Sequence, residues 1–278
     1  MSNPILRVID FFDEIATGSE KKTANMTVVG SYLLFLLCAG VVAKEFSDRD
    51  FSAVLTAGSG AQCLGFFLLL HKIKVQNSVA GISCKTLEMY VLVLIFRLCS
   101  TLFKNGYLPV DKSGDFVYQV CDVATLFVLF QLIYCVRVKN ADTYQREFDS
   151  LPIYRALPGC MAMGVGFHGP LNHAPFFDSV WTIAMNIDMI AMLPQLYMLV
   201  MKGGEVEALT SNYIAAVFVS RCCATAFWCW GYDEMAPKDG SLNFPGYWCL
   251  FAHGVSVLVS ADFMYHYWEA KSGRRSGG

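Results

Sequence analysis

The sequence predicts a multi-pass, all-α membrane protein, and three observations support this fold class. Of the 278 residues, 55% are hydrophobic and only 16% are charged, whereas a soluble domain carries about 25% charged residues. The mean hydropathy is +0.44. Apolar stretches with the length of a bilayer-spanning helix recur along the chain.

A bilayer-spanning helix needs roughly 20 mostly apolar residues, and eight stretches meet or approach this length. In chain order they are 26–43, 51–70, 87–103, 116–136, 157–171, 176–201, 212–230 and 244–268. The first lies within an N-terminal extension, 1–50, and follows an acidic amphipathic segment, so we expect a membrane helix there rather than a cleaved signal peptide. Pro158 interrupts the fifth stretch, which makes its limits the least certain.

Lysine and arginine residues gather in alternate loops between these stretches. Eleven lie in the loops and tail on one side, and four lie in the loops on the other. Cytosolic loops of membrane proteins are rich in these residues. We therefore expect both termini to be cytosolic, with 272–278 as a disordered tail because it is rich in glycine and serine.

Several charged residues fall inside the predicted spans, where charge is costly and usually functional. Arg97 and Arg221 each lie near the middle of a span. The acidic residues in or near the spans are Asp122, Asp178, Asp188 and Asp262.

Helical spacing places polar and aromatic residues in stripes, because positions seven apart share a helix face. Asp178, Trp181 and Asp188 form one stripe, and Arg221 and Trp228 form another. Tryptophan also packs in apolar interiors, so both a binding role and a packing role fit these two aromatic residues.

The arginines allow two interpretations, because a guanidinium pairs with a carboxylate through two hydrogen bonds. In the first, the stripes face one cavity that binds a ligand with anionic and cationic groups. In the second, Arg97 and Arg221 pair with Asp188 and Asp262 as clamps inside the protein.

Other classes of function are disfavoured by the sequence. A net charge of −2 provides no basic surface for nucleic acid. No acid–base or nucleophile constellation indicates an enzyme. Most of the 11 cysteines lie in apolar stretches, and no His/Cys cluster has metal-ligand spacing, so we expect neither a metal nor another cofactor.

Several segments together resemble the motifs of one family, the ER lumen protein-retaining (KDEL/HDEL) receptors. They are Ala-Gly-Ile-Ser-Cys-Lys at 80–85 with Arg97 twelve residues later, Asp-Thr-Tyr-Gln-Arg-Glu-Phe at 142–148, Pro-Gln-Leu-Tyr-Met at 194–198, the segment 202–221, and Asp-Phe-Met-Tyr at 262–265. The resemblance covers roughly 53–271.

The resemblance implies a seven-helix PQ-loop (SWEET-like) core at 51–271, built of two triple-helix bundles, with the helix at 26–43 added. It implies a receptor in endoplasmic reticulum (ER) and Golgi membranes. Such a receptor binds the C-terminal tetrapeptide of escaped soluble ER proteins, and coatomer-coated vesicles return the complex. Parallel repeats place the site between the two bundles.

The resemblance also implies roles for individual residues. Arg97 takes the peptide carboxylate, Arg221 holds an acidic group, and Asp178 faces the fourth ligand residue from the end. The full expected ligand-binding set is Arg97, Arg221, Asp178, Asp188, Trp181, Trp228 and Asp262. Lys271, Arg274 and Arg275 serve either in coat recruitment or as anchors at the lipid surface.

This chain departs from the family pattern at several site positions. An arginine, a histidine and two tyrosines of the family are here Leu55, Gln62, Ser220 and Ala224, respectively. Glutamine does not titrate as histidine does. His253 and His266 are the candidates for a substitute proton sensor.

These departures leave two other functions open. One is a PQ-loop transporter of a small solute, which a continuous aqueous path would favour. The other is a non-catalytic structural subunit of a membrane complex, with the extra helix as its docking element.

Overall fold

The computed structural model describes residues 30–45, 51, 53–104, 116–171, 173–202, 211–237 and 240–276, with the side chains of 211 and 266–276 excepted. The chain divides into two compact units, 1–41 and 42–278. A helix at 30–45 begins in the first unit. The described residues contain helices and loops and no strand. The predicted domain limits at 50 and 271 stay predictions.

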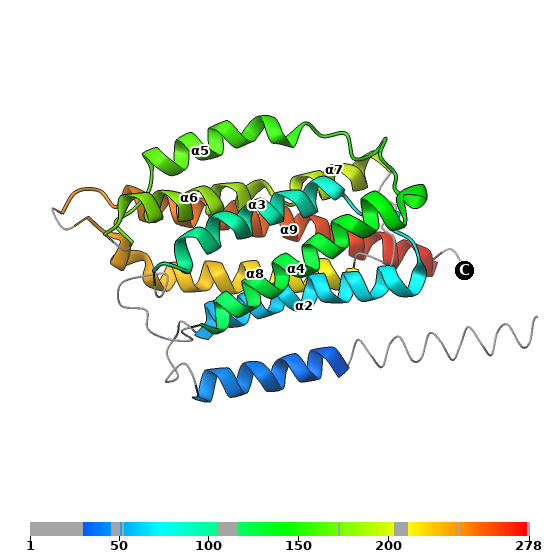
Figure 1. Ribbon diagram of the computed structural model, residues 1–278, viewed down its shortest axis with the longest axis horizontal. Coiled ribbons are helices and arrows are strands. Elements are labelled where there is room, and N and C mark those ends of the chain that lie inside the picture. Colours follow the sequence, from blue (N-terminus) through cyan, green and yellow to red (C-terminus); the bar gives the residue numbers. More distant parts are fainter. Residues whose placement is uncertain are drawn as a thin grey trace, which may run out of the picture. The chain divides into compact units, whose positions relative to one another are not determined.

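The second unit consists of long helices that lie alongside one another (Figure 1). They are α2 (Ala53–Gln76), α3 (Cys84–Thr101), α4 (Val117–Tyr134), α5 (Leu157–Gly166), α6 (Pro175–Ile190), α7 (Leu193–Met201), α8 (Ser211–Trp230) and α9 (Phe244–Ser276). A π-helical turn, η1 (Cys135–Lys139), and three 3-10 turns, η2 (Ala141–Thr143), η3 (Ile153–Ala156) and η4 (Gly231–Met235), join them.

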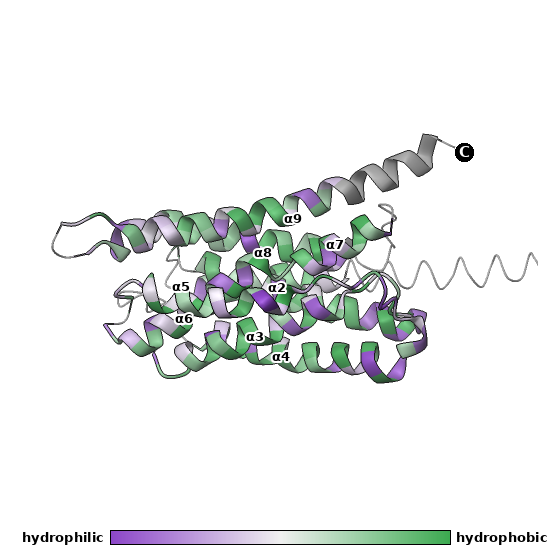
Figure 2. Cartoon of the chain, turned by 90° about the horizontal axis from the view of Figure 1, so that it is seen from above, coloured by the Kyte–Doolittle hydropathy of each residue, from purple (hydrophilic) through white to green (hydrophobic). Residues whose placement is uncertain are grey.

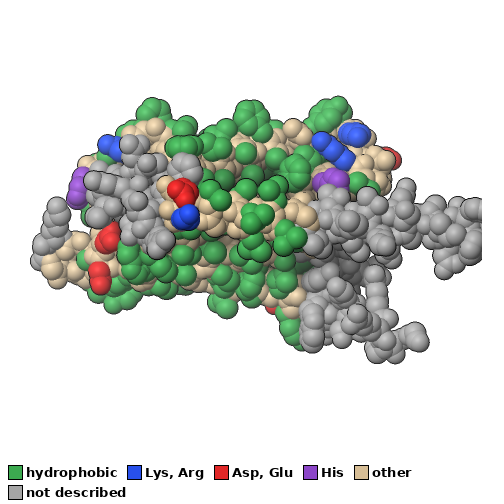
Figure 3. Space-filling view, turned by 90° about the horizontal axis from the view of Figure 1, so that it is seen from below, with side chains coloured by type: hydrophobic (Ala, Val, Ile, Leu, Met, Phe, Trp, Pro, Cys, Tyr) green, Lys and Arg blue, Asp and Glu red, His purple; other side chains and the backbone are tan. Residues whose placement is uncertain are grey.

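Five described segments are long and apolar enough to cross a bilayer, which supports the predicted all-α membrane class. They are Ala53–Gln76, Val117–Lys139, Pro175–Met201, Asn212–Met235 and Phe244–Tyr265. α3 and α5 lie in two other predicted stretches, and α5 has only 10 residues. Hydrophobic residues run along the helices in Figure 2, and hydrophobic side chains are spread along the face in Figure 3, as lipid contact requires.

Local signals in the sequence explain where several helices begin. Ser83 caps α3, because its side chain accepts a hydrogen bond from the backbone N–H of Thr86. Prolines occupy the first turns of α5, α6 and α7, where their missing N–H groups cost no hydrogen bond. Pro194 also separates α7 from α6, because a proline inside a helix removes one hydrogen bond.

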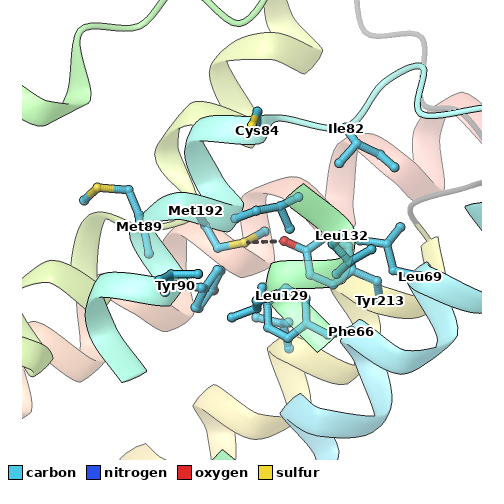
Figure 4. Close-up of a cluster of buried hydrophobic side chains, with 14 of the residues drawn as sticks. Phe66, Leu69, Ile82, Cys84, Met89, Tyr90, Leu129, Leu132, Met192 and Tyr213 are labelled. Carbon is cyan, nitrogen blue, oxygen red and sulfur yellow. Dashed lines mark hydrogen bonds between the residues drawn. The ribbon is translucent and has the colours of Figure 1, made fainter. Parts of the chain in front are cut away.

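The largest buried cluster joins α2, α3, α4 and α8 around aromatic side chains (Figure 4). The Phe66 ring lies 5.1 Å from the rings of both Tyr90 and Tyr213. The Tyr213 hydroxyl donates to the Met192 sulfur at 3.4 Å, so this buried tyrosine keeps a partner for its polar end.

Three of the motif segments meet at one end of the helices. The Gln195 side chain accepts from the Ser83 backbone N–H at 2.9 Å and donates to the Gly81 carbonyl at 2.8 Å. The Asp149 carboxylate accepts from the Ser83 hydroxyl at 2.8 Å and from the Tyr144 hydroxyl at 2.6 Å. Burial and this bond raise the pKa of Tyr144, which stays a donor. Hydrogen bonds between these motifs therefore connect the loop between α2 and α3 with the start of α7, next to the break between α6 and α7.

α5 packs closely against α6 because Gly164 has no side chain. A Cβ atom at this position would lie 2.3 Å from Ile183 Cγ1 and 2.8 Å from the Ile183 backbone nitrogen. Nearby, the Asn186 amide donates to the Cys160 carbonyl at 3.1 Å and accepts from the Trp248 indole at 2.9 Å. Asn186 thereby joins α5, α6 and α9.

We expect Gly164→Ala to lower the midpoint of thermal unfolding in detergent, because overpacking costs about 1–3 kcal/mol. Gly159→Ala is the matched control, since a Cβ there meets no atom within 4 Å and alanine gains about 1 kcal/mol of helix propensity over glycine. Equal shifts for the two variants would show that the close α5–α6 contact is wrong.

Candidate functional site

A cavity with a water-accessible volume of about 40 Å³ lies between α2, α3, α6, α8 and α9. A buried water needs about 10–15 Å³ on this measure, so the cavity accommodates a few waters or one small polar group. The residues that line it are Leu55, Gly58, Ser59, Gln62, Val93, Arg97, Trp181, Ala184, Met185, Asp188, Ser220, Arg221, Ala224, Trp228 and His253. This set contains five of the seven residues expected to bind ligand.

Arg221 lies at the centre of the site and is only 2% exposed. It forms a two-pronged ion pair with Asp188 of α6, in which Nη2 lies 2.6 Å from Oδ1 and Nη1 contacts Oδ2. Nη2 also donates to the Tyr90 hydroxyl of α3 at 3.2 Å. One guanidinium therefore ties α8 to both α6 and α3.

Arg97 forms the second ion pair, which is partly buried, with Asp122 of α4. Its Nε lies 2.7 Å from Asp122 Oδ2, and its Nη2 lies 2.6 Å from Oδ1. Asp122 is 1% exposed. The sequence analysis identified Asp122 as an acid inside a predicted span but assigned it no partner. The signal that could have indicated Arg97 as its partner is that the two residues lie on consecutive helices of the chain.

The aromatic residues of the site form a stack across three helices. The Trp181 and Trp228 rings lie 4.8 Å apart. The His253 ring of α9 lies 6.2 Å from the Trp228 ring with an interplanar angle of 17°. Both tryptophans and His253 line the cavity. Trp181 and Trp228 therefore pack against each other and also contact the cavity.

The other sequence-predicted residues lie elsewhere. Asp178 is buried at the first turn of α6, where it accepts from the Ala174 backbone N–H at 3.2 Å, and does not line the cavity. The clamp interpretation is confirmed for Arg221 and Asp188. It is wrong for Asp262, which is exposed on α9, because Arg97 pairs with Asp122 instead. The side chains of His266, Lys271, Arg274 and Arg275 lie outside the described residues.

Four positions where the chain departs from the family pattern all line this one cavity. They are Leu55, Gln62, Ser220 and Ala224. Each replacement is uncharged. These four positions therefore lie at the surface that a ligand would contact.

The cavity is close to electrically neutral, because each arginine that lines it is paired with one carboxylate. Such an interior can bind a polar or singly charged group by hydrogen bonds, and each further charge would need its own counter-charge.

We expect Arg221→Met and Asp188→Leu each to destabilise the protein by about 3–5 kcal/mol, because either change leaves one buried charge unpaired. The double variant should cost less than the sum of the single changes, and unfolding in detergent would measure this coupling. The same cycle on the exposed Lys44–Glu45 pair is the control, expected to give about 0–1 kcal/mol. Additive effects at Arg221 and Asp188 would contradict the buried ion pair.

Comparison with known proteins gives one consistent result. The sequence model of the ER lumen protein retaining receptor family matches residues 78–231, more than half of the chain. The ER lumen protein-retaining receptor of Saccharomyces cerevisiae is 29% identical over 76% of this chain and 91% of its own length. ER lumen protein-retaining receptor 3 of Xenopus tropicalis is 28% identical, over 76% and 90%. The chain therefore belongs to the ER lumen protein retaining receptor family.

Proposed function

We propose that this chain is a retrieval receptor, which binds the C-terminal KDEL/HDEL-type signal of soluble ER proteins in the Golgi and returns them to the ER in vesicles. The observation that carries the proposal is a cavity lined by two arginines, the partly buried Arg97 and the buried Arg221, in a chain of this family. Family membership favours this function over a small-solute transporter or a structural subunit, and a receptor of this kind is not an enzyme.

The finer fold that we propose is a seven-helix PQ-loop core. One bundle consists of α2, α3 and α4, and the other of α6–α7, α8 and α9, with α5 beside α6. The helix contacts support this division: α4 packs on α2 and α3, and α9 packs on α6 and α8. Between the bundles, α2 packs on α8 and α3 on α6, as parallel repeats would do.

The peptide enters this site carboxyl end first in our proposal. Binding pockets for small ligands have volumes of about 300–1,000 Å³, far above the about 40 Å³ present. The cavity as it stands therefore suits only a terminal group, and a whole tetrapeptide requires the surrounding helices to separate. Asp178 lies in the first turn of α6, and Asp262 is exposed on α9. In our proposal, these two residues would contact only a ligand that extends beyond the cavity.

Localisation follows from the same proposal. The receptor would lie in ER and Golgi membranes in contact with lipid, with both termini in the cytosol. The tail residues Lys271, Arg274 and Arg275 would then be available to the coatomer coat.

The direct test is binding of a labelled peptide ending in KDEL or HDEL to the purified full-length protein, at about pH 5.5 and about pH 7.5, on either side of the ordinary histidine pKa of about 6.5. We expect saturable binding that a C-terminal amide abolishes, because the amide removes the terminal charge.

Ala224→Phe should weaken this binding at least about tenfold, because it fills the cavity. Val219→Phe is the matched control, since Val219 lies on the same helix and is 49% exposed. Folded protein that binds no peptide at either pH would refute the proposed function.

A further inference from the structure

One exposed amide side chain lies deep within the apolar span formed by α4 and η1, Val117–Lys139. It belongs to Gln131, and it makes no hydrogen bond to another described residue. At a rise of about 1.5 Å per residue, Gln131 lies about 12 Å along the helix axis from Lys139, the nearer end of the span. A glutamine side chain is much shorter than this distance. The amide of Gln131 therefore stays within the hydrocarbon core of a bilayer, which is about 30 Å thick.

Gln131 lies in the middle of the outward face of this span. The residues that pack against α2 and α3 lie on the opposite side of α4, and they include the buried Asp122, Thr125, Leu129 and Leu132. The exposed residues recur at spacings that place them on one side of a helix. Besides Gln131, they are Val120, Phe127, Phe130, Tyr134 and Val138. The outward face is therefore an apolar and aromatic surface with one amide at its centre.

An amide in contact with lipid tails is unfavourable, because the tails offer neither a hydrogen-bond donor nor an acceptor. The other amide side chains deep in the described spans lie inside the protein. Gln62, Asn186 and Gln195 are each at most 2% exposed, and the last two donate hydrogen bonds to backbone carbonyls of other segments. Gln131 departs from this pattern, and a hydrogen-bond partner on another molecule would remove the cost.

A second copy of this chain supplies a partner of the required chemistry at the required depth. A carboxamide contains both an acceptor oxygen and a donor NH₂ group, so two identical side chains can exchange two hydrogen bonds. Copies inserted in the same orientation hold Gln131 at the same depth, and a two-fold axis along the membrane normal brings the two amides together. Phe127 and Tyr134, one turn away on either side, would then pack across the same contact.

We propose that two copies of this chain dimerise in the membrane through the outward faces of α4, with their Gln131 side chains hydrogen-bonded to each other at the centre. None of the residues that line the cavity belongs to α4. The dimer therefore forms without a bound peptide, and the inference does not rest on the proposed function.

The test measures self-association of the purified full-length protein in phosphatidylcholine vesicles, without peptide. Donor-labelled and acceptor-labelled copies are mixed, and energy transfer is followed as the protein is diluted with lipid, which gives Kd for the dimer. Gln131→Leu should raise this Kd about three- to thirtyfold, because hydrogen bonds between polar side chains of membrane helices contribute free energies in this range. The variant should fold normally, since leucine suits a surface in contact with lipid.

Phe251→Leu is the matched control, because Phe251 is 54% exposed on α9, which packs against α6 and α8. This variant should leave the Kd of the dimer unchanged. A second measurement locates the contact: the photoreactive residue benzoylphenylalanine replaces either Tyr134, which is 58% exposed on the outward face of α4, or Phe251. Irradiation should cross-link two copies of the chain from position 134 and not from position 251.

Three results would overturn the inference. The first is wild-type protein that stays monomeric at every ratio of protein to lipid. The second is a dimer whose Kd is the same in Gln131→Leu as in the wild-type protein. The third is a cross-link from position 134 only to its own chain or to a different protein, which would assign the outward face of α4 to another occupant.

Discussion

The pairing of buried charges is the constraint on which the rest of this structure depends. An arginine in an apolar interior is tolerated only where a carboxylate meets it with good geometry. Arg221 satisfies this condition through Asp188 and also reaches Tyr90, so the positions of α8, α6 and α3 are coupled. Arg97 does the same for α3 and α4 through Asp122. Together the two pairs set the walls of the cavity.

These pairs also limit what the cavity can bind. Since each guanidinium already holds a carboxylate, the site offers a few remaining donors rather than two free positive charges. The side chains of Leu55, Gln62, Ser220 and Ala224, which also line it, add no charge. A ligand that brings one polar or singly charged group into this interior suits it better than a ligand that brings several acidic groups deep into it.

Some of the motifs that carry the family resemblance connect helix ends in this chain, whereas Arg97 and Arg221 line the cavity. Gln195 and Asp149 each accept a hydrogen bond from Ser83 at one end of the helices, and none of the three lines the cavity. They connect the loop after α2 with the break between α6 and α7. A resemblance at Gln195, Ser83 and the loop at 142–148 therefore supports a shared fold, and the residues that line the cavity are mostly other ones.

By itself, the sequence determined the all-α membrane class and the helical stripes that hold Trp181, Asp188, Arg221 and Trp228, because hydropathy and the 3.6-residue period are local properties of the chain. Only the tertiary structure decided which acid each arginine meets. Asp122 and Asp262 both lie in spans, yet only Asp122 is buried against Arg97. It also decided that Gln62 and His253 face the same cavity. Such pairings depend on which helices are neighbours and how each is rotated, and that information arises only when the helices pack.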